Sequence, residues 1–285
     1  MIDSHAHLHH PQLANDLEGV IKRFAEEGGS YIVNSAIDLE SSHIVLEQAG
    51  NYHEILPTLG IHPEVLVPGS DVYISSVNEG WIKKNIDVLE GLIAKHPEVT
   101  AIGECGLDYY WVKSERLSGS SEIFSKQKLL FTKQIELALK FGLPMIIHCR
   151  DENGDKQCEA EILEILAKEG KGHIRGIFHS YTGSKSYLED ILALGYYVSF
   201  NAILTYKTGE SVRELLDMVP DERLLIESDA PLLSPQKRRS AGIKIGEPAF
   251  VDEVADFIAK RKSYTKEKLW SIVESNFKRL FAISQ

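Results

Sequence analysis

The sequence places histidines and carboxylates directly after short apolar segments, and these residue types bind divalent cations. His5 and His7 follow the opening Met-Ile-Asp. In an extended strand, residues i and i+2 point the same way, so the two imidazoles would project together as a pincer for one ion. Neutral imidazole combined with carboxylate suits zinc, manganese, iron or nickel.

Further histidines and carboxylates follow other apolar segments, and together they suggest a site for two ions. Each residue alone has an ordinary explanation, such as a helix cap, an ion pair or a hydrogen-bonded histidine. If these positions were coincidental, the residues would lie at both ends of the fold, whereas all of them directly follow an apolar segment. The predicted ligands are His5, His7, Glu104 and Asp229 for the first ion, and Glu104, His148 and His179 for the second.

This ligand set predicts hydrolytic chemistry. Glu104 is the expected bridge, because a carboxylate can bind two ions at once. Water at such a pair is acidified to a nucleophile near neutral pH, and Asp229 could accept its proton. His62 also follows an apolar segment and is expected to face the site and touch substrate. The other histidines, including His9 and His10, are predicted to be surface or helix-packing residues.

The elements that must position these residues alternate along the chain. Helical patterns separate apolar segments that are nearly continuous, as in strands buried on both faces. The predicted strands are the opening 1–3, 31–36, 55–59, 99–103, 143–147, 174–178, 196–200 and 223–227. The predicted helices are 12–28, 40–50, 125–142, 158–170, 186–195 and 210–218, with 248–261 and 265–282 closing the barrel.

Eight strands alternating with helices favour a (β/α)8 TIM barrel that forms one domain over residues 1–285. An open, doubly wound sheet is the alternative. No Gly-x-Gly-x-x-Gly follows the first strand, which weakens a dinucleotide-binding interpretation. Three long loops, 64–80, 109–124 and 231–248, follow strands and would rim the catalytic face. Basic residues at 237–244 would guide a nucleic-acid strand there, or simply form a solvated surface loop.

Composition narrows the class of protein. The hydrophobic content of 43% and charged content of 26% are ordinary for a folded soluble protein. The net charge of −11 argues against non-specific adhesion to nucleic acid, but not against a nucleic-acid substrate whose phosphate meets metal ions.

The three cysteines form no disulfide or zinc pattern, and we expect reduced thiols. Without a signal-peptide pattern or membrane-spanning run, the expected location is the cytoplasm. Nothing in the sequence requires an oligomer.

Longer motifs along the whole chain resemble the TatD family of metal-dependent deoxyribonucleases, within the amidohydrolase-like barrels. They are Asp-Ser-His-Ala-His-Leu (3–8), Gly-Ile-His-Pro (60–63), Gly-Glu-Cys-Gly-Leu-Asp-Tyr (103–109), Gln-Lys-Leu-Leu-Phe (127–131), Leu-Pro-Met-Ile-Ile-His-Cys-Arg (143–150), His-Ser-Tyr-Thr-Gly (179–183), Glu-Ser-Asp-Ala-Pro-Leu-Leu (227–233) and Asn-Phe-Lys-Arg-Leu-Phe (276–281). The resemblance implies a (β/α)8 barrel, a two-metal site and phosphodiester hydrolysis.

The resemblance also implies roles for individual residues. The family's metal ligands fall on the same six positions, and its substrate contacts would fall on His62, Asp108, Tyr109 and Arg150. Magnesium or manganese often supports activity in this family, and zinc is often bound. This sequence departs from the family at Tyr181-Thr182-Gly183 and at Ile245-Gly246-Glu247-Pro248, where Arg-Asn-Glu-Pro is usual. The loop 109–124 is also longer than is typical.

The sequence leaves three candidate functions for this protein. The first is a 3′ to 5′ exonuclease or related phosphodiesterase on DNA or RNA ends, with Arg150 holding a flanking phosphate. The second is a metal-dependent amidase, lactonase or D-aminoacyl-tRNA deacylase on the same barrel. Many such barrels place a carbamylated lysine where this chain has Glu104, which favours the first function. The third is a non-enzymatic scaffold, whose signature would be missing ligands, and none of the six is missing.

Overall fold

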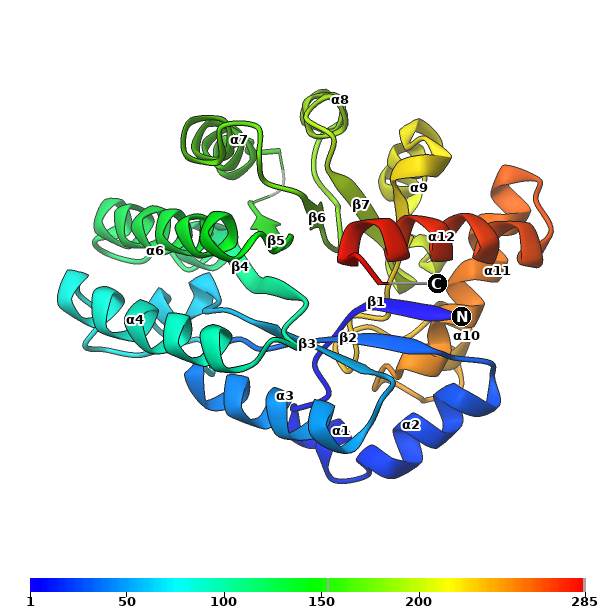
Figure 1. Cartoon of the computed structure of the whole chain (residues 1–285). Coiled ribbons are helices and arrows are strands. Elements are labelled where there is room, and N and C mark those ends of the chain that lie inside the picture. The colour runs from blue at the N-terminus through cyan, green and yellow to red at the C-terminus, as the bar shows by residue number, and fades with distance from the viewer. Residues whose placement is uncertain (153, 284–285) are drawn as a thin grey trace.

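The computed structural model describes residues 1–152 and 154–283, and within them eight parallel strands form one sheet in chain order (Figure 1). The strands are β1 (Ile2–Ala6), β2 (Tyr31–Ser35), β3 (Ile55–Leu59), β4 (Ala101–Asp108), β5 (Met145–Arg150), β6 (Gly176–Phe178), β7 (Tyr197–Phe200) and β8 (Leu224–Ile226). A bridge between Ala6 and Ala230 joins the first strand to the segment after the last. The barrel is thus nearly closed, which confirms the (β/α)8 prediction over the open sheet.

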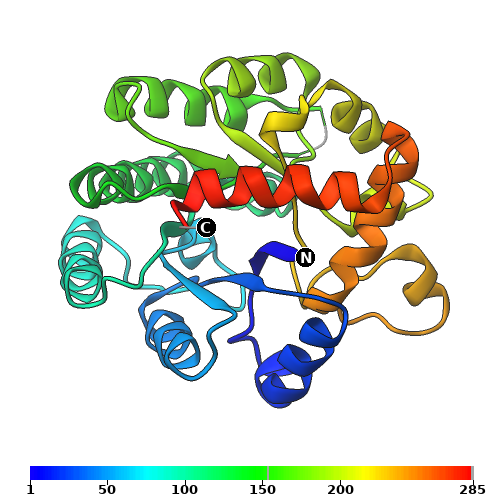
Figure 2. The same cartoon turned by 45° about the vertical axis from the view of Figure 1, so that its right-hand side comes forward.

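Helices surround the strands as an outer ring (Figure 2). They are α1 (Pro11–Ala14), α2 (Leu17–Glu26), α3 (Leu39–Asn51), α4 (Glu79–Lys95), α5 (Tyr110–Ser114), α6 (Ser120–Phe141), α7 (Gln157–Gly170), α8 (Lys185–Ala193), α9 (Glu210–Met218), α10 (Gln236–Ser240), α11 (Val251–Lys262) and α12 (Lys266–Phe281), with 3-10 turns η1 (Pro63–Leu66), η2 (Ala202–Thr205), η3 (Asp221–Arg223) and η4 (Pro248–Phe250). Helix α12 packs on β1 and β8, and so covers the seam where the barrel closes.

The apolar strand segments are buried on both faces, as parallel strands between a barrel interior and a helix layer require. Consecutive residues Ile146 and Ile147 of β5 are both completely buried. On the helix side, α6 contributes Leu130, Phe131 and Ile135 to this core. Burying each such side chain stabilises the fold by about 1.5–3 kcal/mol. No helix in the described ranges is long and apolar enough to cross a lipid bilayer.

The helices differ from the predicted ones in three places. Helix α4 was not predicted, although it buries Ile82, Ile86, Leu89 and Ile93 at helical spacing. The predicted helix 12–28 is broken between α1 and α2, because Asn15 and Asp16 are poor helix formers. The loops 109–124 and 231–248 contain short helices, α5 and α10, and the first loop also contains the first turn of α6.

Candidate metal centre

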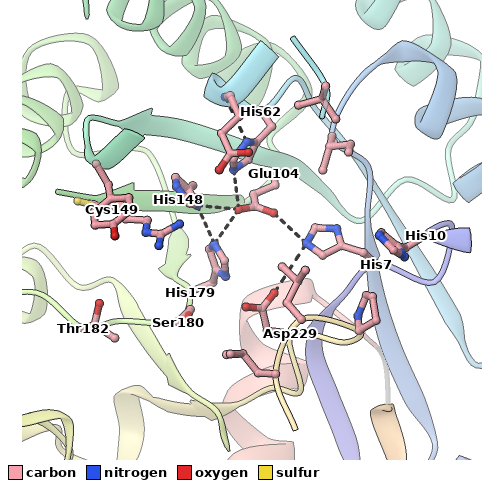
Figure 3. Close-up of a pocket in the computed structure, with 18 of the residues that line it drawn as sticks. His7, His10, His62, Glu104, His148, Cys149, His179, Ser180, Thr182 and Asp229 are labelled. Atoms are coloured by element: carbon pink, nitrogen blue, oxygen red, sulfur yellow. Dashed lines mark hydrogen bonds and ion pairs between the residues drawn. The ribbon is translucent and has the colours of Figure 1, made fainter. Parts of the chain in front are cut away.

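The six predicted ligands converge at the carboxyl ends of the strands, and Figure 3 labels all of them except His5. Each side chain is held by a strand or by the segment directly after one, which places all six at the same end of the barrel. We call these six residues the cradle: His5, His7, Glu104, His148, His179 and Asp229. Ligand atoms of His5, His7 and Asp229 lie within 4.8 Å of one another, and so do those of His5, Glu104 and His179.

Glu104 lies at the centre of the cradle, and its two oxygens face different imidazoles. Its Oε2 atom is 3.2 Å from Nε2 of His5 and 3.3 Å from Nε2 of His7. Its Oε1 atom is 2.9 Å from Nδ1 of His148 and 2.8 Å from Nε2 of His179. This is the arrangement expected of a carboxylate that bridges two cations.

With its imidazoles in the neutral form that binds metal, the cradle brings lone pairs together without enough hydrogens to satisfy them. The Nδ1 atom of His7 lies 3.0 Å from the carbonyl oxygen of Ser35, to which it can only donate, so Nε2 of His7 keeps its lone pair. That atom is 3.1 Å from Nε2 of His5. Asp229 Oδ1 is buried 3.7 Å from His5 Nε2 and has no hydrogen-bond donor in the described part of the chain. This donor set fits a divalent cation.

Buried carboxylates behind the cradle orient its imidazoles. Nε2 of His148 is 3.0 Å from Oδ2 of Asp108, and Nδ1 of His179 is 3.6 Å from Oε1 of Glu227. Glu227 in turn accepts hydrogen bonds from Ser199 and from Asn201. An acidic partner on the far ring nitrogen fixes the orientation of a ligating histidine and increases its basicity. The structure therefore places Asp108 behind His148, and its predicted contact with a substrate stays a prediction.

The charges of the cradle shift several pKa values. Burial acts to raise the pKa of Glu104, but neighbouring imidazoles, foremost His179, outweigh it and hold that pKa well below its usual range. Burial acts to lower the pKa of His148, but hydrogen bonds to Asp108 and Glu104 raise it to about 9. Burial raises the pKa of Asp229 to about 7. Without metal, the site thus holds protons where cations would otherwise balance its carboxylates.

His62 reaches the cradle in a different role from the six ligands. Its Nδ1 atom accepts a hydrogen bond from the backbone N–H of Glu64 at 3.2 Å, so in the neutral ring Nε2 carries the hydrogen. That Nε2 lies 3.1 Å from Glu104 Oε1. His62 therefore offers a hydrogen-bond donor to the cavity, in keeping with the expectation that it faces the site.

Two buried amides on α6 hold the backbone near the cradle. Gln127 accepts from the N–H of Asp108 at 2.9 Å and donates to the carbonyl oxygen of the same residue at 2.9 Å. Gln134 forms the same pair of hydrogen bonds with Ile61, which precedes His62. It accepts from the N–H of Ile61 at 2.8 Å and donates to its carbonyl oxygen at 3.0 Å. This role of the two glutamines was not predicted from the sequence.

Asp3 joins the first strand of the barrel to the segment after the last. Its side chain is completely buried and accepts from the hydroxyl of Ser228 at 2.5 Å and from the N–H of Ser228 at 2.8 Å. It also accepts from the N–H of His5 at 3.3 Å. The N–H of Asp229 donates to the carbonyl oxygen of His5 at 3.0 Å. Asp3 thereby fixes the spacing between ligands that come from opposite ends of the chain.

Gly106 allows β4 and β5 to approach closely beside the cradle. Its φ of 147° lies in a region that favours glycine, and a Cβ atom there would collide with the carbonyl oxygen of His148. The register of β4 on β5 also shifts between Ile102 and Cys105. We conclude that a glycine at this position is needed to bring Glu104 and His148 together.

A cavity of about 740 Å³ opens above the cradle. Its lining includes five cradle residues together with His62 and Arg150, and also His9 and His10, which were predicted to lie elsewhere. Tyr109, a predicted substrate contact, is fully buried, and its hydroxyl donates to Glu161 at 2.5 Å. Neither Tyr109 nor Asp108 lines the cavity. We call the following residues the rim: Glu64, Tyr110, Arg150 and Leu232, which line the cavity, and Trp111, which donates a hydrogen bond to Glu64.

Two of the basic residues at 237–244 are engaged by neighbouring side chains. Arg238 forms an ion pair with Glu253 at 2.5 Å and lies 3.7 Å from the ring centroid of Phe250. Arg239 lies 5.2 Å from the centroid of the Tyr206 ring. These contacts account for both arginines structurally, which favours the surface-loop interpretation for this half of the basic segment.

A barrel with this buried histidine and carboxylate cluster is the architecture of a metal-dependent hydrolase. The family model described as TatD related DNase matches residues 2–282, and the chain belongs to this family. An uncharacterized metal-dependent hydrolase, YabD of Bacillus subtilis, is 35% identical over 284 residues, which cover 100% of both chains. The 3′-5′ ssDNA/RNA exonuclease TatD of Pantoea vagans is 28% identical over 287 residues, again covering 100% of both.

A solved structure agrees with this assignment. The crystal structure of YJJV, a TatD homolog from Escherichia coli, superposes with a TM-score of 0.81 at 25% identity. The match covers 100% of this chain and 98% of the other. The chain is therefore a metal-dependent hydrolase of the TatD-related family.

Proposed function

We propose that this hydrolase cleaves phosphodiester bonds at the 3′ ends of single-stranded DNA or RNA, using two divalent cations held in the cradle. The observation that carries the proposal is the position of Glu104, whose two oxygens face two separate groups of imidazoles. Two cations that share one bridging carboxylate can stabilise both the attacking and the leaving oxygen of an in-line displacement at phosphorus. The name of the Pantoea vagans relative, an exonuclease on single-stranded DNA and RNA, supports this choice of substrate.

The proposed ligands divide into two groups that share Glu104. The first ion would be held by His5, His7, Glu104 and Asp229, and the second by Glu104, His148 and His179. When bound, the ions supply Lewis-acid charge to a phosphoryl oxygen and lower the pKa of a water. The imidazole-rich donor set suits zinc or manganese, and the carboxylates also suit magnesium.

Side chains of this chain would bind the substrate and move the proton. Asp229 would take up the proton of the attacking water, because its carboxylate is buried in the cradle and its Oδ1 atom is not engaged by a donor in the described residues. The Nε2–H of His62 donates a hydrogen bond to the phosphoryl group beside the cradle. Arg150, exposed at the rim, binds a further phosphate through its planar guanidinium group.

The test compares wild-type protein with Glu104→Gln after reconstitution with manganese or zinc. The wild type should bind two ions per chain, measured by mass spectrometry of the metal content, and should degrade single-stranded oligonucleotides from the 3′ end. Glu104→Gln should lose at least one ion and about 10³-fold in turnover, because an amide bridges cations poorly. Glu159, a buried carboxylate outside the cradle, supplies the matched control Glu159→Gln, which should keep its metal and its turnover.

Parallel assays on lactones, aminoacyl esters and amides test the second function with the same proteins. If the wild type cleaves one of these and leaves oligonucleotides intact, the phosphodiesterase proposal is wrong while the hydrolase assignment stands. If Glu104→Gln keeps both ions and full activity, the two-ion arrangement is wrong.

A further inference from the structure

The rim carries two adjacent aromatic residues on the long loop after β4, one half-buried and one exposed. Tyr110 lines the cavity, and Trp111 beside it leaves 36% of its surface exposed. Both residues lie on the short helix α5. Large aromatic side chains usually bury their surface, so an exposed tryptophan next to a tyrosine that lines the cavity indicates a binding surface.

The aromatic pair is combined with a cation. The guanidinium of Arg150 lies 4.1 Å from the ring centroid of Tyr110 and 5.2 Å from that of Trp111. The two rings meet edge to face, with centroids 5.1 Å apart. Arg150 is itself exposed and lines the cavity with Tyr110, so this group combines two aromatic rings and a flat cation beside the cavity.

Contacts to two neighbouring loops hold this aromatic–cation group in place. The indole N–H of Trp111 donates to Oε1 of Glu64, on the loop after β3, at 3.1 Å. Lys113 of α5 binds Asp151 and Asp155, on the loop after β5, at 2.6 Å each. Rings that are already oriented lose little conformational entropy when a flat ligand stacks on them.

We propose that Tyr110, Trp111 and Arg150 form a stacking subsite for a nucleobase of the strand being degraded; this inference rests on the proposed function. Nucleobases stack on aromatic rings and on guanidinium planes without regard to sequence. The subsite would hold the base of a nucleotide next to the scissile phosphate, while the cradle acts on the phosphate itself. It would make the enzyme prefer nucleotide substrates over phosphodiesters that have no base.

The kinetic test uses oligothymidylate and the same oligomer with abasic tetrahydrofuran residues at its 3′ end. Wild-type protein should process the abasic oligomer with kcat/KM lower by about tenfold, within the range for loss of one stacked base. Trp111→Ala should lose a similar factor on oligothymidylate, through KM, and change little on the abasic oligomer. Trp111→Phe should recover most of the loss, since a phenyl ring still stacks.

The abasic oligomer distinguishes two roles of Trp111: stacking on a base, and holding Arg150 in position. Both oligomers carry the same phosphates, so loss of the phosphate contact of Arg150 alone would weaken both equally. Equal losses on the two oligomers, or no loss on either, would overturn the proposed subsite. The matched control is Tyr264→Ala, because Tyr264 also lies beneath a cation, Lys268, at 3.6 Å. Its hydroxyl donates to Asp221, before β8 and therefore at the opposite end of the barrel, so its activity should not change.

A binding measurement on metal-free protein tests the subsite without turnover. Oligothymidylate should quench part of the tryptophan fluorescence of the wild type, and this part should be missing in Trp111→Phe. The abasic oligomer should quench neither protein. If wild-type protein cleaves no oligonucleotide under any metal, the proposed function fails, and the quenching experiment still decides the subsite by itself. Absence of Trp111-dependent quenching would overturn it.

Discussion

The cradle and the rim surround the same cavity but are built from different parts of the barrel. Cradle side chains come from strand ends and are nearly inaccessible: Glu104 is 2% exposed and Asp229 7%. Rim side chains come from the loops after the strands, where Trp111 is 36% exposed and Leu232 59%. The first region is fixed by the barrel itself, whereas the second depends on segments that can change without disturbing the strands.

We infer from this difference that the cradle carries out the chemistry and that the rim selects the substrate. Buried partners hold the cradle: Asp108 behind His148, Glu227 behind His179, and Ser35 behind His7. Ligands on rigid elements with such partners keep the geometry that metal binding requires. Loop residues tolerate substitution and tune what enters the site. Changes in the cradle should therefore reduce metal binding and turnover, and changes in the rim should raise KM.

The largest effect should come from Asp229→Asn in the cradle. An amide cannot accept the proton of the attacking water, so kcat should fall by about 10³-fold, within the range for loss of a general base. The near-isosteric side chain should keep at least the second ion. Steady-state kinetics on oligonucleotides together with metal analysis would check this. A change confined to KM would contradict the division between cradle and rim.

An intermediate effect should come from Asp3→Asn, behind the cradle. Burial raises the pKa of Asp3 to about 8, far above the usual range of an aspartate, so the folded protein retains a proton that the unfolded chain releases. The unfolding free energy of metal-free wild type, relative to Asp3→Asn, should therefore fall as pH rises from about 4 to about 8, by at most about 1.4 kcal/mol per pH unit.

Urea unfolding of both proteins across that pH range would measure the effect of Asp3. Asp190, an exposed aspartate on α8, supplies the control Asp190→Asn, whose stability should run parallel to wild type at every pH. If Asp3→Asn also runs parallel to wild type, Asp3 is not buried in a charge-excluding site as the structure describes.

The smallest of the three effects should come from Arg150→Lys at the rim. Lysine keeps the charge but loses the planar fork and the stacking on Tyr110, so KM for oligonucleotides should rise about tenfold. The value of kcat and the metal content should stay close to wild type. A loss of bound metal in this variant would show that the rim and the cradle are not separable.

The same division explains what the sequence could predict. The six cradle residues were found because strand ends put alternate side chains in one place and because strands are recognised by their apolar runs. The motifs that resemble the TatD family supported the same positions. The structure brings all six together, with His62 as an adjoining donor.

Features that depend on tertiary contacts were missed. Asn34, Gln127 and Gln134 are buried amides that bond to backbone next to the cradle, but in sequence they are indistinguishable from surface polar residues. Asp108 and Tyr109 were expected to touch substrate, whereas the structure buries both. Nothing in the loop sequence 109–124 indicated that Tyr110 and Trp111 would stand over Arg150.

The cradle also joins the two ends of the polypeptide. His5 and His7 belong to the first strand, while Asp229 follows the last, and the two segments meet at the bridge between Ala6 and Ala230. During synthesis, therefore, a chain still lacking its final strand carries only part of the ligand set. If the proposed ligands hold the ions, we expect hydrolytic activity to appear only after the last strand has completed the barrel.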